Sequence, residues 1–177
     1  MKEMAGYRIR TFGDPVLKRR AQEVTEIDGR LATLADEMLA TMREARGLGL
    51  AAPQVGIGRR LFVYQMGDES PRTIINPRIV ESDGEWEYEE GCLSLPGLFF
   101  PIVRAKRVHV TGYDLDGREV SLEAEDLEAK LFQHELDHLD GKLLLEMLDQ
   151  DQRKAAMKEL RRRSELAGNS LPGSGHP

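Results

Sequence analysis

The segment that most constrains the fold lies at residues 134–138 and reads HELDH. At about 100° per residue, a helix places its first and last positions only about 40° apart, one turn from each other. The imidazoles of His134 and His138 can then reach one metal ion, and Glu135 flanks them. The chain is therefore expected to fold around a helix that carries a metal site.

The neighbouring residues indicate that both histidines face the protein interior. Apolar residues at Leu127 and Leu131 precede them at spacings of four and three, and so share their side of the helix. Polar residues fall on the opposite side, and Gly141 is placed to end the helix. These polar residues are Lys130, Gln133, Asp137 and Asp140. Two core histidines satisfied by backbone groups are the alternative, but the intervening glutamate favours metal binding.

A catalytic site of this kind needs a third protein ligand and an open position. The histidine that would complete an HExxHxxGxxH pattern is missing, because Leu144 stands there. Glu159 is a possible ligand, although an ion pair is the simpler interpretation among its basic neighbours. The only cysteine, Cys92, lies in the segment EGCLSLPG and is the remaining candidate. A small buried side chain and a nucleophile are its alternative roles.

A run of small residues, GLGLAAPQ, occupies positions 47–54. Small side chains allow the backbone of a ligand to approach closely. The amide of Gln54 is a suitable donor for an oxyanion. A helix end followed by a tightly packed turn is the alternative interpretation of this run.

The remaining pattern predicts an α+β fold. Apolar residues at helical spacing predict a helix at 28–46 that Gly47 ends, and Asp14-Pro15 predicts the start of a short helix. Strands are predicted at 60–66, 72–80, 106–114 and, after a turn at Asp116-Gly117, at 119–125. Helices and strands do not alternate regularly, which favours antiparallel sheets over a parallel α/β sheet.

Composition limits the class of protein. A chain of 177 residues predicts one domain, placed at 1–167, with a flexible tail at 168–177. The net charge of −6 argues against a general nucleic-acid binder, and no specific DNA binding is expected. Without a long apolar run or a secretory signal, no membrane partner is expected. A single cysteine fits a reducing compartment, so the expected location is cytoplasmic.

Two blocks of charge stand out. Residues 81–90 hold six carboxylates and no cation, and a solvated strand rim is the simplest interpretation. Residues 151–163 hold six Lys or Arg residues against two acids at helical spacing. The second block predicts a basic helix near the C-terminus, which is a candidate surface for ribosomal RNA.

Together, three of these segments resemble the peptide deformylase family. The family motifs GxGLAAPQ, EGCLS and QHExDHLxG are matched in order and without mismatch at 47–54, 90–94 and 133–141. The resemblance covers roughly residues 7–147 and is closest in form to bacterial members. It implies an α+β fold with antiparallel β-sheets packed around a central HExxH-bearing helix, with a C-terminal helix.

The resemblance also implies a role for each matched position. The metal ligands are Cys92, His134 and His138, the general base and acid is Glu135, and the oxyanion donors are Gln54 and the Leu93 N–H. Backbone at Gly47 to Gly49 is expected to hold the formylmethionyl end of the substrate. Leu48 and Leu131 are expected to line an apolar side-chain pocket, the latter because it shares the histidine side of the helix.

The implied reaction removes the formyl group from the N-terminal formylmethionine of nascent polypeptides and releases formate. Hydroxide supplied by the metal attacks the formyl carbon. One divalent ion per chain is expected, with iron (Fe²⁺) favoured by the resemblance and zinc (Zn²⁺), nickel (Ni²⁺) or cobalt (Co²⁺) as substitutes. Thiolate and imidazole ligands alone suit all of these metals. The expected partners are N-formylmethionyl nascent peptides and the ribosome.

Two other functions fit parts of the sequence. A small zinc endopeptidase fits HExxH, but not EGCLS or the missing downstream ligand. A non-catalytic, metal-dependent binding module would leave Glu135 and Gln54 without a task. Cleavage of internal peptide bonds identifies the first, and an ion saturated by four protein ligands identifies the second.

Overall fold

The computed structural model describes residues 6–168, which divide into two compact units between Leu143 and Leu144. The second unit contains the short 3₁₀ helix η3 (Leu144–Met147) and the helix α3 (Gln150–Gly168). The predicted single domain at 1–167 remains a prediction. Of the predicted tail, Gly168 is the last residue of α3, and 169–177 lie outside the described residues. No helix among residues 6–168 is both long and apolar enough to cross a membrane.

A five-stranded antiparallel sheet organises the first unit, with strand order β1-β2-β3-β6-β7. Its strands are β1 (Gly49–Ala51), β2 (Leu61–Tyr64), β3 (Arg72–Asp83), β6 (Arg107–Tyr113) and β7 (Glu119–Glu125). The last four lie where strands were predicted. The predicted turn is also present, because Gly117 adopts φ +75° between β6 and β7. The short strand β1 was not predicted as a strand, and its residues belong to the run of small residues at 47–54.

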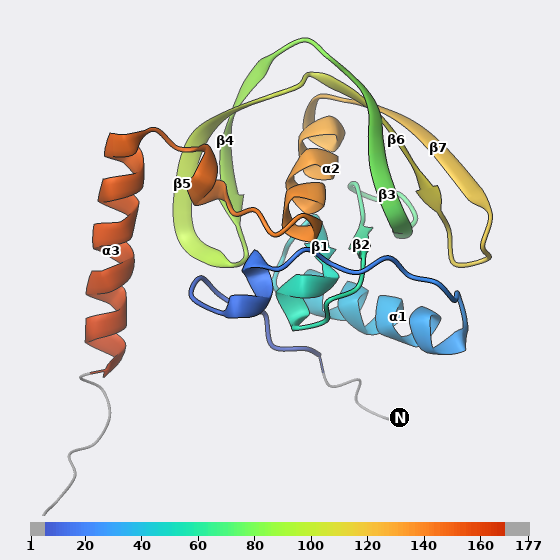
Figure 1. Cartoon of the computed structure of the whole chain (residues 1–177), viewed down its shortest axis with the longest axis horizontal. Coiled ribbons are helices and arrows are strands. Elements are labelled where there is room, and N and C mark those ends of the chain that lie inside the picture. Colours follow the sequence, from blue (N-terminus) through green and yellow to red (C-terminus); the bar gives the residue numbers. More distant parts are fainter. Residues whose placement is uncertain (1–5, 169–177) are drawn as a thin grey trace, which may run out of the picture. The chain divides into compact units, whose positions relative to one another are not determined.

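Helices cover both faces of this sheet. On β2, Leu61 and Val63 pack into one core cluster with α1 (Gly29–Glu44), while Phe62 and Tyr64 pack into another with α2 (Asp126–Leu139). Successive strand residues point to opposite faces, so a strand covered on both sides is apolar at every position. The fold is therefore α+β with antiparallel sheets around the HExxH helix α2, as predicted (Figure 1).

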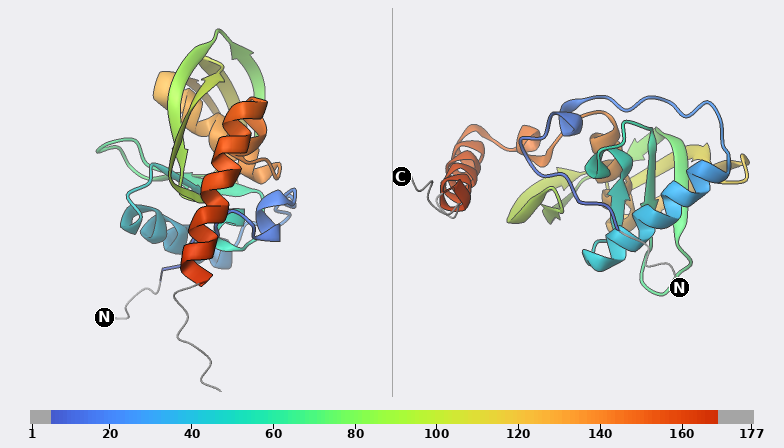
Figure 2. Two further views of the ribbon diagram at one scale, coloured as in Figure 1. Left: turned by 90° about the vertical axis from the view of Figure 1, so that its left-hand side faces the viewer. Right: turned by 90° about the horizontal axis from the view of Figure 1, so that it is seen from below.

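A second, two-stranded sheet connects β3 to β6 and was not predicted in full (Figure 2). Its strands are β4 (Trp86–Cys92) and β5 (Leu95–Arg104), paired antiparallel with an irregularity between Gly91 and Cys92. Strand β5 was not recognised in the sequence because it contains Pro96, Gly97 and Pro101, and such residues are rare inside central strands. A two-stranded sheet has only edges, where a proline that cannot donate a hydrogen bond is tolerated.

The helix ends agree with the prediction at Asp14, which caps the 3₁₀ helix η1 (Pro15–Lys18), and at Gly141, but not at Gly47. Asp28 caps α1 by accepting a hydrogen bond from the Leu31 N–H. That helix ends at Glu44, and Arg46 rather than Gly47 adopts the left-handed conformation (φ 56°). After α2, Gly141 has φ +74°, and a Cβ added there would lie 2.7 Å from the Lys18 carbonyl oxygen. Glycine at 141 thus serves both the turn and the close approach of two chain segments.

Candidate metal centre and active-site cavity

Three potential metal ligands from two distant segments converge beside α2. The helix presents His134 and His138, and the end of β4 presents Cys92, 42 positions before His134. The Cys92 Sγ and His138 Nε2 atoms lie 3.2 Å apart, as do the His138 Nε2 and His134 Nε2 atoms. All three ligand atoms lie within 4.8 Å of one another. The structure thus brings together the three residues expected to bind the metal.

These side chains fit a divalent transition-metal ion. One thiolate and two imidazole nitrogens form a donor set suited to zinc, iron, nickel or cobalt. Both histidines are buried, and the buried Glu135 Oε2 atom has no hydrogen-bond partner within residues 6–168. With Cys92, His134 and His138 as its ligands, such an ion would remain open to water or substrate.

The charges of the ligands support one another. Burial raises the pKa of the Cys92 thiol, but His138 and His134 outweigh this effect and lower it well below its usual value. Burial lowers the pKa of His134, whereas Cys92 and Glu90 raise it well above its usual value. The arrangement favours the thiolate, which is the form of cysteine that binds metals. Burial also raises the pKa of Glu135, although both histidines act in the opposite direction.

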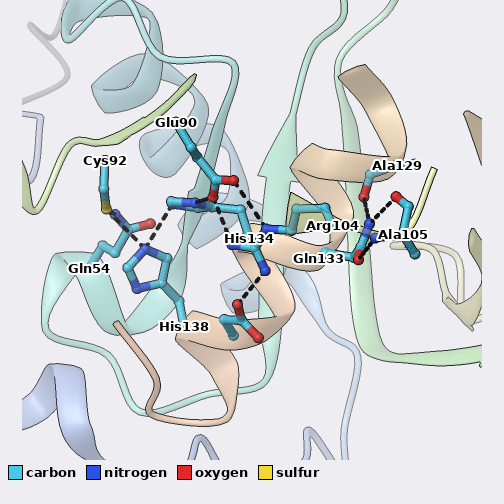
Figure 3. A network of polar contacts seen from close by, with 10 residues as sticks. Gln54, Glu90, Cys92, Arg104, Ala105, Ala129, Gln133, His134 and His138 are labelled. Carbon is cyan, nitrogen blue, oxygen red and sulfur yellow. Dashed lines mark hydrogen bonds and ion pairs between the residues drawn. The ribbon is translucent and has the colours of Figure 1, made fainter. Parts of the chain in front are cut away.

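A buried carboxylate orients His134. The side chain of Glu90 is fully buried, and its Oε1 atom lies 2.5 Å from His134 Nδ1 (Figure 3). Arg104 donates to both oxygens of Glu90, at 2.7 and 3.1 Å, and to Asp137 at 2.6 Å. Burial raises the pKa of Glu90, but the hydrogen bonds from His134 and Arg104 hold it at about 2. An ionised Glu90 accepts a hydrogen bond from the Nδ1–H of His134 and so leaves Nε2 free for a metal.

This support for the metal ligands was not predicted from the sequence. The interpretation of residues 81–90 as a solvated rim is wrong for Glu90, which is 0% exposed. Asp137 was assigned only to the polar side of the helix, yet it bonds Arg104. The available signal was position: Glu90 lies only two residues before Cys92, in the same motif that supplies the thiolate.

Gln54 is held in one orientation next to the thiolate. It belongs to the 3₁₀ helix η2 (Ala52–Val55) and is 1% exposed. Its Oε1 atom accepts the Ala51 N–H at 3.0 Å, so the amide nitrogen points the other way. That nitrogen lies 3.2 Å from Ser94 Oγ and 3.8 Å from Cys92 Sγ. The Gln54 amide group can therefore donate into the site.

A cavity of about 610 Å³ opens over these groups, within the size range of small-ligand sites. Every residue predicted for the site lines it except His138, which contacts Cys92 and His134. The predicted residues among its lining are Gly47, Leu48, Gly49, Gln54, Cys92, Leu93, Leu131, His134 and Glu135. A Cβ added at Gly47 would lie 2.8 Å from Leu93, and one at Gly49 would lie 2.8 Å from Leu131. These glycines leave backbone, rather than side chain, at the cavity wall.

Glu159, the other ligand candidate, and His109 each have partners of their own. Glu159 bonds Arg162 and Arg163 within α3, which agrees with the ion-pair interpretation. His109 lies on β6 and contacts Ser121 on β7. His176 lies outside the described residues.

The fold and the cavity define an α+β hydrolase built on an HExxH helix. The sequence model of the polypeptide deformylase family matches residues 7–154. The chain therefore belongs to the peptide deformylase family, hydrolases that remove the N-terminal formyl group from nascent peptides.

Individual relatives agree with this assignment. A peptide deformylase of Acidothermus cellulolyticus is 46% identical over 95% of this chain and 92% of its own length. One of Clostridium botulinum is 49% identical over 72% of this chain and 86% of its own length. The crystal structure of a peptide deformylase from Legionella pneumophila superposes with a TM-score of 0.88 at 40% identity, covering 95% of this chain and all of that one.

We predict that Glu90→Gln weakens metal binding by about 10–100-fold, the usual effect of losing a hydrogen-bond partner of a metal ligand. The neutral amide no longer fixes the His134 tautomer or balances Arg104. Metal affinity, measured by competition with a chelator, checks this outcome. Arg78→Gln is the matched control. It removes an ion pair between the exposed side chains of Arg78 and Glu23, and exposed ion pairs contribute little to stability. Equal metal affinity in both variants would contradict the role of Glu90.

Proposed function

We propose that the chain binds one divalent ion through Cys92, His134 and His138 and removes the formyl group from N-terminal formylmethionine, releasing formate. The observation that carries this proposal is the convergence of the three ligand atoms within 4.8 Å at a cavity lined by Glu135 and Gln54. An ion held there supplies Lewis acidity, which makes water a better nucleophile and the formyl carbon a better electrophile.

Glu135 is proposed as the general base and acid. It is 3% exposed, it follows a metal ligand directly on α2, and its Oε2 atom faces no protein donor within the described residues. In this role it accepts the proton of the attacking water and then delivers a proton to the leaving amine. The C–N bond of the formamide breaks in that step, and formate and a free N-terminal methionine result.

Gln54 and the Leu93 N–H are proposed to stabilise the negative charge that develops on the formyl oxygen. The Gln54 amide is fixed by Ala51 and Ser94, so it is oriented before substrate arrives. Leu93 follows Cys92 directly in the chain, which keeps its N–H close to the thiolate. Preorganised donors of this kind act on the charge of the transition state more than on the substrate.

The cavity wall suits the end of an unbranched, apolar substrate residue. Leu131 and Leu93 supply apolar surface, and Gly47 and Gly49 allow the substrate backbone to come close. The methionine side chain is therefore proposed to contact Leu48 and Leu131, with its backbone along residues 47–49.

The direct test is formate release from a formyl-Met-Ala-Ser peptide by protein purified without oxygen, with metal content measured in the same sample. We expect release to follow metal content, to stop when a chelator removes the metal, and to return when the metal is restored. The unformylated peptide is expected to stay intact. Cleavage of internal peptide bonds would favour the endopeptidase function, and no release from metal-loaded protein would favour the binding module.

Two substitutions separate catalysis from metal binding. Glu135→Ala is expected to retain the metal and lose turnover, because the proton carrier is gone. Gln54→Ala is expected to retain the metal and lower kcat by about 10²–10³-fold. The matched control is Gln133→Ala, which removes an amide that bonds Ala105 outside the cavity and leaves turnover per folded molecule unchanged. Loss of metal in Glu135→Ala would make Glu135 a ligand instead.

Fe²⁺ is proposed as the physiological ion, with Zn²⁺, Ni²⁺ or Co²⁺ able to replace it. The thiolate and imidazole donors accept each of these metals. A thiolate on Fe²⁺ is open to oxidation, so we predict that activity of the iron form decays faster in air than under argon. The nickel form provides the comparison, and equal decay of both forms in air would contradict this assignment.

The proposed location is the cytoplasm, because a single cysteine fits a reducing compartment.

The basic face of α3 is proposed to contact the ribosome, from which formylated chains emerge. Glu159 neutralises part of this face through Arg162 and Arg163. Four cations, Arg153, Lys154, Lys158 and Arg161, then have no ion pair among the described residues. We predict salt-dependent ribosome binding that is lost when these four charges are reversed. Reversal of the exposed Arg8 and Arg30 is the control, and equal loss there would contradict a specific contact.

A further inference from the structure

We propose that Ser94, held by the N-terminal segment at residues 10–12, is a positioning residue that fixes the direction in which Gln54 donates its hydrogen bond. The inference rests on the proposed function and deepens it, because it concerns how this donor is oriented before substrate binds. In this role Ser94 touches no reacting atom and acts only through the Gln54 amide.

The N-terminal segment at residues 10–12 joins two parts of the site by hydrogen bonds. The Arg10 N–H donates to the Gln54 carbonyl oxygen at 2.6 Å, and the Phe12 N–H donates to the Ser94 carbonyl oxygen at 2.9 Å. Between these two bonds, the Arg10 carbonyl oxygen accepts the Ser94 hydroxyl at 2.7 Å. Residues 10–12 therefore connect Gln54 with Ser94, which lie 40 positions apart in the chain.

The hydroxyl of Ser94 has a defined polarity. A serine hydroxyl carries one hydrogen and two lone pairs. Because its hydrogen is donated to the Arg10 carbonyl oxygen, only lone pairs face the Gln54 Nε2 atom, which lies 3.2 Å from Ser94 Oγ. Ser94 is 0% exposed, so bulk water does not compete for these bonds. Ser94 can thus accept from Gln54 but not donate to it.

This polarity leaves Gln54 with one free hydrogen. A side-chain amide has one oxygen and two hydrogens on its nitrogen. The oxygen accepts the Ala51 N–H at 3.0 Å, and Ser94 takes one of the two hydrogens. The same nitrogen lies 3.8 Å from Cys92 Sγ (Figure 3), so the second hydrogen is directed toward the metal centre. That hydrogen is the one proposed to stabilise the charge on the formyl oxygen.

A purely structural role for Ser94 makes a different prediction. In that role the hydroxyl only satisfies the Arg10 carbonyl oxygen, and its loss lowers stability without reference to Gln54. A positioning role depends on Gln54, so the effects of the two residues on turnover are not additive. A double-mutant cycle therefore separates the two roles.

The kinetic experiment uses the nickel-loaded full chain and formyl-Met-Ala-Ser. We expect Ser94→Ala to lower kcat about tenfold and to change KM by less than about twofold, because the Ala51 contact still holds the amide in part. In a Gln54→Ala background, the same substitution is expected to change kcat by less than about twofold, since no amide remains to be oriented. The matched control is Ser121→Ala, which removes a hydroxyl that contacts His109 outside the cavity and leaves kcat unchanged.

A second measurement reports the orientation of Gln54 without activity. In nuclear magnetic resonance spectra of the zinc-loaded chain, the side-chain amide signals of Gln54 are the pair that Gln54→Ala removes. Their exchange with solvent hydrogen is expected to be slow in the wild-type chain and about tenfold faster in Ser94→Ala. Ser121→Ala is expected to leave it unchanged. This measurement tests the position of the amide even if the chain releases no formate, so the inference and the proposed function can fail separately.

Three results would overturn the inference. An equal loss of kcat from Ser94→Ala with and without Gln54 would show that the two residues act independently. Unchanged exchange of the Gln54 amide in Ser94→Ala would show that Ser94 does not hold it. Loss of metal in Ser94→Ala would show that the residue supports Cys92 rather than Gln54.

Discussion

The fully buried Glu90 carboxylate is the constraint on which the candidate site depends. It accepts hydrogen bonds from His134 on α2 and from Arg104 on β5, while it belongs to β4 itself. One group therefore joins three elements. It also determines that Nε2 of His134, and not Nδ1, faces the other two ligand residues. A buried charge is stable only when it is paired, so removing one partner typically costs about 3–5 kcal/mol. The metal centre and the β4–β5 hairpin are consequently coupled: what disturbs one disturbs the other.

The sheet and its helices provide the rigid frame for this group. Because α1 and α2 cover opposite faces of the central sheet, residues in β1 and β2 are buried throughout. Strand β1 lies directly beside α2, where Gly49 faces Leu131 and Glu135. The absence of side chains at Gly47, Gly49 and Gly91 shapes the cavity wall as much as the side chains that are present. Each of these glycines is covered by a residue of a different segment, so the wall is closed without filling the cavity.

Much of the fold was predictable because its signals are local. Helical spacing placed α1 and α2, and four strands of the central sheet lie where alternating or apolar segments predicted them. The hairpin strand β5 was missed because Pro96, Gly97 and Pro101 are poor strand residues, and only its position in a two-stranded sheet makes them acceptable. The end of α1 was also displaced, since Arg46 rather than Gly47 takes the left-handed conformation. Propensity is a weak signal at such points, and packing decides them.

The sequence by itself determined that two histidines share one side of a buried helix with a glutamate between them, because a helix has a fixed period. It also determined the family, through three motifs that no single structural requirement explains. Only the tertiary structure decided that Cys92 comes within 3.2 Å of His138, since chain separation says nothing about distance once strands pair. It likewise decided that Glu90 is buried while its acidic neighbours are exposed, and that residues 10–12 reach Ser94 and Gln54. Burial depends on what packs against a residue, and that partner lies elsewhere in the chain.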